Sequence, residues 1–190
     1  MIGRRAVLRW LSAIAALFAD ARRFDARAAV GEKFKTLTPR QARAVAAIAE
    51  RIWPGAESAG AVIYIDRAIA HAYRRDAPRY RIALAQLDLA ARQRFGVAFV
   101  AASGDEQDAL LRDLESGHLP QLAGSRGTAL FDLLRKHVME GVLSDPIYGG
   151  NRDFAGWKTV GYPGPSREHS AEEQTSLQPS SQPFRSIKDL

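Results

Sequence analysis

The sequence predicts an all-α domain, a small irregular bundle of about five helices. After residue 30, apolar residues recur at three- and four-residue intervals, which is the spacing of one helix face. No run shows the sustained alternation of apolar and polar residues that indicates a half-buried strand. Proline, glycine and N-cap residues divide the region into segments of helical length. Together these features favour helices packed on helices.

The first predicted helix has the clearest boundaries. Thr38 is a candidate N-cap, and Pro39 suits the first helical position. Gln41 stands three residues after the cap, as in a capping box. Apolar residues follow at helical spacing as far as Trp53, and the Pro-Gly pair after it ends the helix.

Four further helices follow, each with a stripe of apolar residues that would face the core. The second of these four ends at Phe95-Gly96, and Ser103 or Asp105 can begin the next one. A chain of 190 residues, 46% of them hydrophobic, is long enough to bury one such core. The four helices are expected at about residues 61–73, 78–94, 103–117 and 127–141.

Residues 1–28 resemble an export signal. They contain a basic start, an apolar run of about 14 residues, and Ala26-Arg27-Ala28 as a small-x-small cleavage pattern. Arg4 and Arg5 match the twin-arginine pattern, which is an address for the Tat translocase rather than an anchor. The run is interrupted by Arg9 and is shorter than the roughly 20 residues that span a bilayer. We therefore expect export of a folded protein to the periplasm, with an ordinary secretory signal as the alternative.

Net charge and cysteine content exclude several functions. The formal net charge is +6, but the six arginines and two aspartates of residues 1–28 supply four of these charges. The remaining domain is nearly balanced, so the sequence gives no support to nucleic-acid binding. The absence of cysteine excludes disulfides, covalent haem attachment and thiolate metal sites. A signal for folded cargo, on a chain without a cofactor motif, indicates that the cargo includes a partner protein.

Residues 144–165, here called the aromatic segment, have no helical or strand period. Large aromatic residues are interspersed there with five glycines and three prolines. Glycine lets a backbone approach another surface closely, proline stiffens it, and aromatic residues supply much of the burial energy of interfaces. The segment is therefore a candidate for docking a partner protein, although it could instead pack on its own helices. The docking candidates are Tyr148, Asn151, Phe154, Trp157 and Tyr162.

After residue 165 the sequence becomes polar and is rich in Ser, Gln, Glu and Pro. Such a composition buries too little apolar surface to fold alone. We therefore expect a helical domain at residues 29–165 and a flexible tail at 166–190. The tail would be disordered alone or ordered only against a partner.

His137 and Glu140 come nearest to a metal-binding pattern. They lie one helical turn apart in "RKHVMEG", which resembles half of a metal grip. A helical di-iron site needs two Glu-x-x-His elements and two further carboxylates, whereas the order here is reversed and no second element exists. The favoured interpretation is the polar edge of an amphipathic helix. Asp66 lies on an apolar helical face and, if buried, is expected to form a structural salt bridge with an arginine.

Three other patterns lack the context that their chemistry needs. Asp145, Asn151 and Asp153 could supply oxygen ligands to calcium, but their spacing does not match the twelve-residue calcium loop. Asn151 and Asp153 more simply cap turns. Ser125 lacks the glycine and strand of a nucleophile elbow, and no phosphate-binding fingerprint surrounds Gly149-Gly150. The sequence therefore offers no catalytic, cofactor-binding or metal-binding residue.

Three stretches of the chain resemble one known family. They are "LTPRQARAVAAIAERIWPG", "GAVIYIDRAIA" and "LLRKHVMEGVLSDPIYGGNRDFAGWKTVGYPGP", and together they cover about residues 36–165. The pattern is similar to the gluconate 2-dehydrogenase subunit 3 family, the small subunits of membrane-associated, flavin-dependent sugar and sugar-acid dehydrogenases. The irregular run within the aromatic segment is its most specific part.

The resemblance implies a subunit without a redox centre. In such complexes a large subunit of the glucose–methanol–choline (GMC) type binds FAD and oxidises the sugar, and a multihaem cytochrome c passes the electrons to the quinone pool. The small subunit binds no cofactor, supports maturation of the flavoprotein and supplies its export signal. The family has no catalytic residues to transfer to this chain.

Two other classes of function remain open. One is a self-sufficient small periplasmic helical enzyme or metal protein. The other is a periplasmic adaptor module for a different partner. The substrate of a sugar dehydrogenase complex would be chosen by the large subunit, so this sequence does not identify it.

Overall fold

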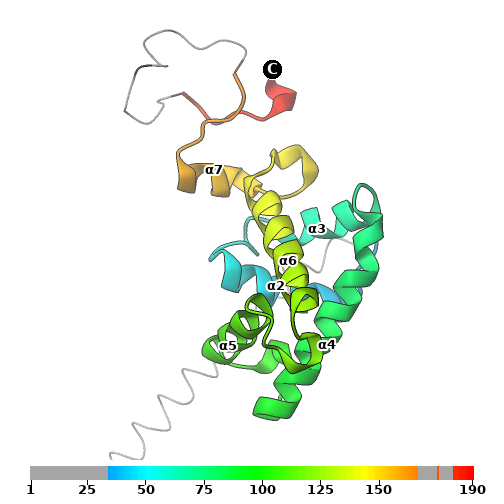
Figure 1. The fold of residues 1–190 in the computed structure, drawn as a ribbon. Helices are drawn as coiled ribbons and strands as arrows, with labels where there is room; N and C mark the ends of the chain where they lie inside the picture. The colour runs from blue at the N-terminus through cyan, green and yellow to red at the C-terminus, as the bar shows by residue number, and fades with distance from the viewer. Residues whose placement is uncertain (1–33, 167–174, 176–181) are drawn as a thin grey trace, which may run out of the picture. The chain divides into compact units, whose positions relative to one another are not determined.

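The structure, a computed structural model, describes residues 34–166, 175 and 182–190. Within these residues the chain is all-α, as the sequence predicts, and contains no strand. The leader, with Arg4 and Arg5, lies outside the described residues, so the export signal stays a prediction. The α-helices are α2 (Pro39–Ile52), α3 (Ala61–Ala70), α4 (Ala77–Phe95), α5 (Gly104–Glu115), α6 (Ser125–Leu143) and α7 (Ala155–Val160), joined in several places by short 3-10 turns (Figure 1).

Helix α6 is the centre of the bundle. It packs against α2, α3, α4 and α5, and Figure 1 shows α7 beyond its C-terminal end. Its buried face is a stripe at four-residue spacing, formed by Leu130, Leu134, Val138 and Val142. Because this stripe continues to the last turn of α6, the core reaches the point where the aromatic segment begins. In the described part of the chain, no helix is both long and apolar enough to cross a bilayer.

The boundaries of α2 and α3 show how local hydrogen bonds set helix ends. The predicted capping box of α2 is present: Gln41 N–H donates to Thr38 Oγ1, and Thr38 N–H donates to Gln41 Oε1. Helix α3 ends at Ala70, whereas the sequence predicts a helix as far as Tyr73. The N–H groups of His71 and Tyr73 both donate to the Ala68 carbonyl, at 3.2 and 2.7 Å, and this turn ends the helix before Tyr73.

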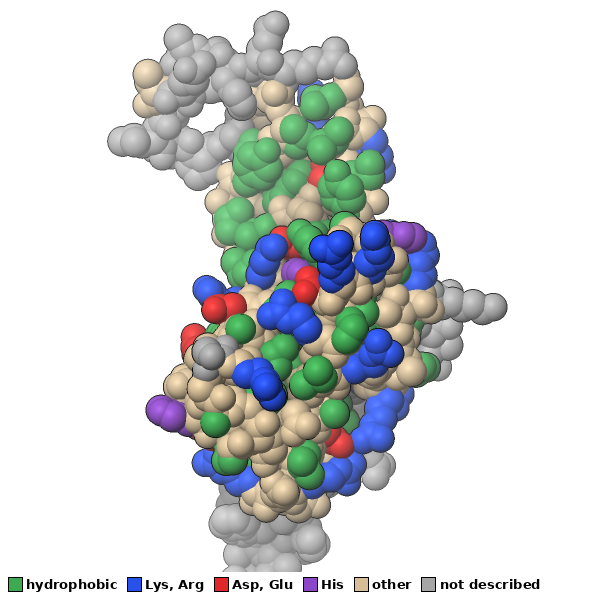
Figure 2. Space-filling model, turned by 45° about the vertical axis from the view of Figure 1, so that its right-hand side comes forward, with side chains coloured by type: hydrophobic (Ala, Val, Ile, Leu, Met, Phe, Trp, Pro, Cys, Tyr) green, Lys and Arg blue, Asp and Glu red, His purple; other side chains and the backbone are tan. Residues whose placement is uncertain are grey.

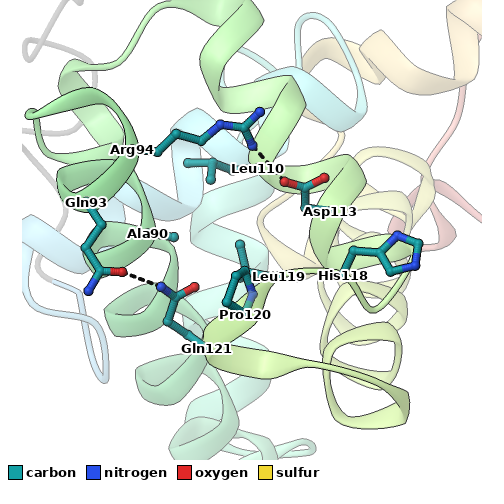
Figure 3. A pocket seen from close by; sticks show the side chains of 9 residues that line it. All are labelled: Ala90, Gln93, Arg94, Leu110, Asp113, His118, Leu119, Pro120 and Gln121. Atoms are coloured by element: carbon teal, nitrogen blue, oxygen red, sulfur yellow. Dashed lines mark hydrogen bonds and ion pairs between the residues drawn. The ribbon is translucent and has the colours of Figure 1, made fainter.

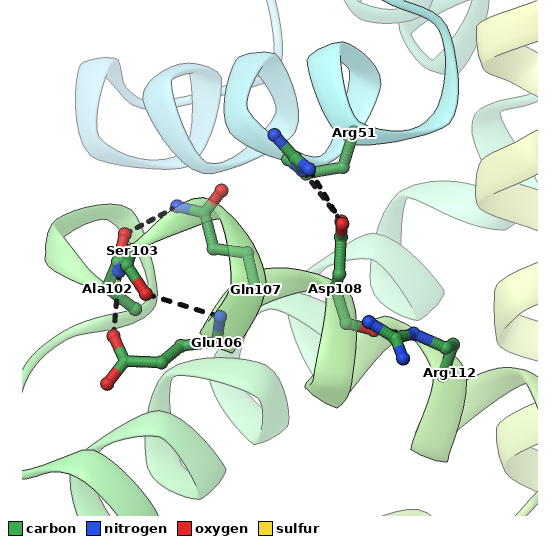
Figure 4. Close-up of polar contacts among 7 residues, drawn as sticks. All are labelled: Arg51, Ala102, Ser103, Glu106, Gln107, Asp108 and Arg112. Atoms are coloured by element: carbon green, nitrogen blue, oxygen red, sulfur yellow. Dashed lines mark hydrogen bonds and ion pairs between the residues drawn. The ribbon is translucent and has the colours of Figure 1, made fainter.

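Helix α5 is fixed at its N-terminus and tied to α2 (Figure 4). Glu106 N–H donates to Ser103 Oγ, and Ser103 N–H donates to Glu106 Oε2 at 2.7 Å, which completes a second capping box. Arg51 of α2 donates to both carboxylate oxygens of Asp108, at 2.7 and 2.6 Å. The Arg51 guanidinium holds the pKa of Asp108 below its usual value. Both groups are partly exposed, so this pair adds little stability and mainly orients the two helices.

Asp66 is buried on α3, but its contacts differ from the predicted salt bridge. Its carboxylate accepts hydrogen bonds from the backbone N–H groups of Lys35, Thr36 and Leu37, at 2.6, 2.9 and 2.8 Å. Backbone amides thus take the role that the sequence gives to an arginine, because successive N–H groups of a turn can converge on one carboxylate. These hydrogen bonds hold the residues that precede α2 against α3.

Substitution of the N-cap residue of α5 tests whether its capping box stabilises the helix. Ser103→Ala removes the side-chain acceptor for the Glu106 N–H and should lower the free energy of unfolding by about 1 kcal/mol. Ser116→Ala, at the exposed C-terminal end of the same helix, is the matched control and should change it by less than about 0.5 kcal/mol. Urea denaturation followed by circular dichroism measures both. Equal effects of the two substitutions would show that the capping box does not stabilise α5.

Candidate functional site

The aromatic segment contains more regular structure than the sequence predicts. Two 3-10 turns, Pro146–Tyr148 and Arg152–Phe154, are followed by the six-residue helix α7. Helix α7 has left-handed residues at both ends, because Phe154 has a φ of 56° and Gly161 a φ of 70°. A helix this short shows no apolar period, and glycines lie on both sides of it, so the sequence pattern conceals it.

Asn151 anchors the aromatic segment to the end of α6. Its side chain is fully buried, and its Nδ2 donates to the carbonyl of Ser144 at 2.9 Å. Its Oδ1 accepts from the backbone N–H of Gly156 at 2.9 Å, and its own N–H donates to the carbonyl of Gly141 at 2.9 Å. Asn151 has a φ of 45°, a conformation that asparagine tolerates better than most residues. The sequence predicts a docking residue here, but the structure places this side chain inside the chain.

Trp157 is a second internal anchor. Only 4% of the residue is exposed, and its indole Nε1 donates to the Leu143 carbonyl at 2.7 Å. The ring stacks on Phe154 at a centroid distance of 5.5 Å and meets Tyr162 edge-on at 5.1 Å. Trp157 is a docking candidate in the sequence; the structure packs it on its own chain, where its N–H donates to a carbonyl at the end of α6.

Two glycines let this part of the chain lie directly on α6. A Cβ at Gly150 would overlap the carbonyl oxygen of Gly141, and a Cβ at Gly156 would overlap that of Val142. Glycine is therefore required at both positions for the backbones to approach this closely. Gly150, which no phosphate-binding fingerprint surrounds, therefore has a packing role.

The remaining docking candidates reach the surface. Tyr148 is 54% and Tyr162 is 45% exposed, while Phe154 is half-buried. Ile147 and Val160, which the aromatic pattern of the sequence does not single out, are exposed to a similar degree. Figure 2 shows hydrophobic side chains gathered over this end of the molecule. We call Ile147, Tyr148, Val160 and Tyr162 the apolar face; exposed large apolar side chains gathered at one end of a protein indicate a candidate interaction site.

The end of the chain packs against the aromatic segment. Residues 182–190, here called the strap, contain Ser186, whose side chain is fully buried and donates to Asp145 at 2.6 Å. Phe184 stacks on Phe154 at 5.9 Å, and the Arg185 N–H donates to the Pro163 carbonyl at 3.0 Å. The sequence predicts a flexible tail from residue 166; within it, residues 182–190 pack on their own chain. A usable signal was the Ser-x-x-Asp pattern that ends at Asp189, because Ser186 N–H donates to that carboxylate.

The three calcium candidates are not brought together as a metal site. Asp145 accepts hydrogen bonds from Ser186 and from two backbone N–H groups, and Asn151 is bonded to α6 and α7. Burial acts to raise the pKa of Asp145, but these hydrogen bonds outweigh it and hold the pKa below its usual value. Asp153 is exposed. Among the described residues no group of three or more His, Cys, Asp or Glu side chains could hold a metal ion.

His137 lies inside the bundle rather than on the polar edge that the sequence predicts. It is fully buried, its ring stacks on Tyr73 at 4.5 Å, and its Nδ1 lies 3.2 Å from the Tyr80 hydroxyl. Glu140 accepts hydrogen bonds from the hydroxyls of Tyr64 and Tyr73, at 3.0 and 3.2 Å. Glu140 is therefore engaged by tyrosines, and the two residues do not form a metal grip. Burial lowers the pKa of His137, so its ring is neutral at pH 7.

A pocket of about 290 Å³ lies between α4, α5 and the 3-10 turn Pro120–Leu122 (Figure 3). Four of its polar side chains are paired, since Arg94 lies 2.8 Å from Asp113 and Gln121 donates to Gln93, and the fifth, His118, is exposed. Within the described residues, Gln121 Oε1 has no hydrogen-bond partner. One acceptor beside a closed ion pair is too little to hold a cofactor, and we assign no function to this pocket.

Comparison with known proteins identifies the family. A family model described as gluconate 2-dehydrogenase subunit 3 matches residues 39–164. The match begins with α2, includes all of α2 to α7 and nearly all of the aromatic segment, and leaves out the strap. The chain belongs to the gluconate 2-dehydrogenase subunit 3 family. The resemblance seen in the sequence is confirmed, and family membership makes the chain a subunit of a dehydrogenase complex. A search of curated proteins and a search of solved structures each found no match.

The anchoring role of Asn151 predicts a large loss of stability on truncation. Asn151→Ala leaves the Ser144 carbonyl and the Gly156 N–H buried without their partner, and should lower the free energy of unfolding by about 3 kcal/mol. Tyr148→Ala truncates an exposed side chain of the same segment and should change it by less than about 0.5 kcal/mol. Thermal and urea denaturation of both variants measure the difference. If Asn151→Ala were as stable as Tyr148→Ala, the anchor would be ruled out.

His137 predicts a loss of stability in acid. The unfolded state has a histidine pKa of about 6.5, whereas burial lowers the folded value, so below about pH 6.5 the unfolded state binds the extra proton. The free energy of unfolding should therefore fall as the pH drops below this point, by at most about 1.4 kcal/mol per pH unit from this one group. His137→Gln cannot titrate but can still bond to Tyr80, so it should lack this component. Urea denaturation between pH 7.5 and 5.5 compares the slopes, and identical slopes would contradict the assignment.

Proposed function

We propose that the chain is the non-catalytic small subunit of a periplasmic, membrane-associated, FAD-dependent dehydrogenase complex that oxidises a sugar or sugar acid. The observation that carries the proposal is the apolar face, which lies within the family's matched region on a segment held in place by buried anchors. Its partner is a large subunit of the GMC type, which binds FAD and oxidises the substrate. A multihaem cytochrome c then accepts the electrons.

The arrangement of the aromatic segment supports a docking role. Asn151 and Trp157 fix its backbone to α6 from within, and Tyr148 and Tyr162 then present their rings to solvent. Rings that are already positioned lose little conformational entropy when a partner covers them. Burying the exposed part of each side chain in the apolar face would contribute about 1 kcal/mol before the costs of association. A rigid aromatic surface of this kind suits a stable subunit contact.

In this proposal the chain binds the flavoprotein and directs it to the Tat translocase for export. Bound to the apolar face, the large subunit is held in a folded, FAD-loaded state and crosses the membrane with this chain. Arg4 and Arg5 are the address that the Tat translocase reads for both proteins. The leader's match to the twin-arginine pattern and the absence of a cofactor motif in the sequence support this division of labour.

Co-expression with the large subunit tests the proposal. Without this chain, the flavoprotein should have less than about a tenth of its activity or should remain in the cytoplasm, because its address and its docking partner are both missing. Replacing Arg4 and Arg5 together by Lys should leave both proteins in the cytoplasm, with the assembled pair intact. Cell fractionation, FAD content and dye-linked dehydrogenase activity are the measurements. Full activity and normal export of the large subunit in a strain that lacks this chain would overturn the proposal.

A further inference from the structure

We propose that the strap completes the docking surface, by adding its own apolar side chains to the apolar face that binds the large subunit. This inference rests on the proposed function and deepens it. It concerns residues 182–190, which lie outside the matched region of the family at 39–164.

Asp145 joins the strap to the aromatic segment. Its Oδ1 accepts from the Ile147 N–H at 3.0 Å and from Ser186 Oγ at 2.6 Å, and its Oδ2 accepts from the Ile187 N–H at 2.7 Å. Because the two isoleucine N–H groups donate to one carboxylate, Ile187 of the strap must lie beside Ile147 of the apolar face. Asp145 and Ser186 are both buried, so this joint is part of the fold rather than a loose surface contact.

A second set of contacts fixes the direction of the strap. Phe184 stacks on Phe154, and its ring is also approached by the Lys158 ammonium at 5.8 Å. The Arg185 N–H donates to Pro163, and a Cβ at Gly164 would overlap the Arg185 carbonyl. Gly164, with a φ of +106°, is therefore needed both for its backbone conformation and for the room that it leaves to the strap. The aromatic segment is thus built to receive the strap.

With the strap in place, two more large apolar side chains lie exposed at this end. Ile187 is 52% and Leu190 is 38% exposed, while Ile147 is 52% exposed. Exposed large apolar side chains gathered at one end of a chain are typical of a surface that a partner covers. The strap therefore enlarges the apolar face instead of shielding it.

The charged residues around the strap favour a partner protein whose contact surface carries carboxylates. Lys158, Arg185 and Lys188 are exposed near the apolar face, and Figure 2 shows further Lys and Arg side chains over the neighbouring helices. Two exposed carboxylates, Asp153 and Asp189, also lie at this end, and Asp189 accepts from the Ser186 N–H. An apolar centre with a mainly basic rim fits a partner surface with apolar residues bordered by carboxylates. We assign that surface to the large subunit.

The test uses the full chain co-expressed with its large subunit. The double variant Ile187→Ser/Leu190→Ser changes only exposed side chains of the strap and should weaken binding of the large subunit at least ten-fold, with the melting temperature of the chain unchanged. The matched control is Ile82→Ser/Leu89→Ser, which replaces the same residue types at similarly exposed positions of α4. It should bind as the wild type does. Co-purification and titration by biolayer interferometry measure both.

The outcomes separate this inference from the proposed function. If Tyr148→Ser/Tyr162→Ser weakens binding but Ile187→Ser/Leu190→Ser does not, the strap inference is overturned and the proposed function stands. If the wild-type chain does not bind the large subunit at all, the proposed function itself fails. Equal losses in the strap variant and the α4 control would also overturn the inference. So would a strap variant that binds the large subunit normally but loses self-association, or loses flotation with phosphatidylglycerol vesicles.

Discussion

The buried amide of Asn151 is the contact on which the surface of this protein depends. One side chain satisfies the Ser144 carbonyl after the end of α6 and the first free N–H groups of α7, so it joins the core helix to the exposed segment. Without it, several buried polar groups would lose their partners at once. The same region is held by Trp157, whose Nε1 donates to a carbonyl at the end of α6. Gly150 and Gly156 leave room there for the two backbones to lie in contact. The backbone that carries the exposed tyrosines is therefore held in position by buried residues.

The sequence predicted the bundle well because helix signals are local. The Thr38 and Ser103 capping boxes, and the apolar stripes between them, lie within a few residues of one another and need no tertiary information. Helix α7 escaped prediction because Phe154 enters it in a left-handed conformation, which no propensity anticipates. The partner of Asp66 was also missed, because three backbone amides about thirty residues away leave no trace in the side-chain pattern.

The sequence singled out residues 144–165 as a candidate docking segment, but it could not say which of its residues are buried and which are exposed. Aromatic and glycine content identified residues 144–165, yet composition cannot say which ring points inward. Trp157 is buried because its N–H reaches the Leu143 carbonyl, whereas Tyr148 lies on a 3-10 turn that leaves it exposed. The strap was missed for a related reason: its polar composition conceals Ser186 and Ile187, which bind a carboxylate about forty residues earlier in the chain.

Because the aromatic segment is attached to the end of α6, the apolar face can form only after that end of the helix has folded. Its anchors bond to the carbonyls of Gly141, Leu143 and Ser144, and these carbonyls are in place only when the last turn of α6 has formed. That turn in turn needs Val142 packed in the core. A protein that binds the apolar face therefore recognises chains whose core is complete and passes over those still folding. Such a surface would distinguish folded from unfolded chains, and the export of an assembled complex that we propose requires that distinction.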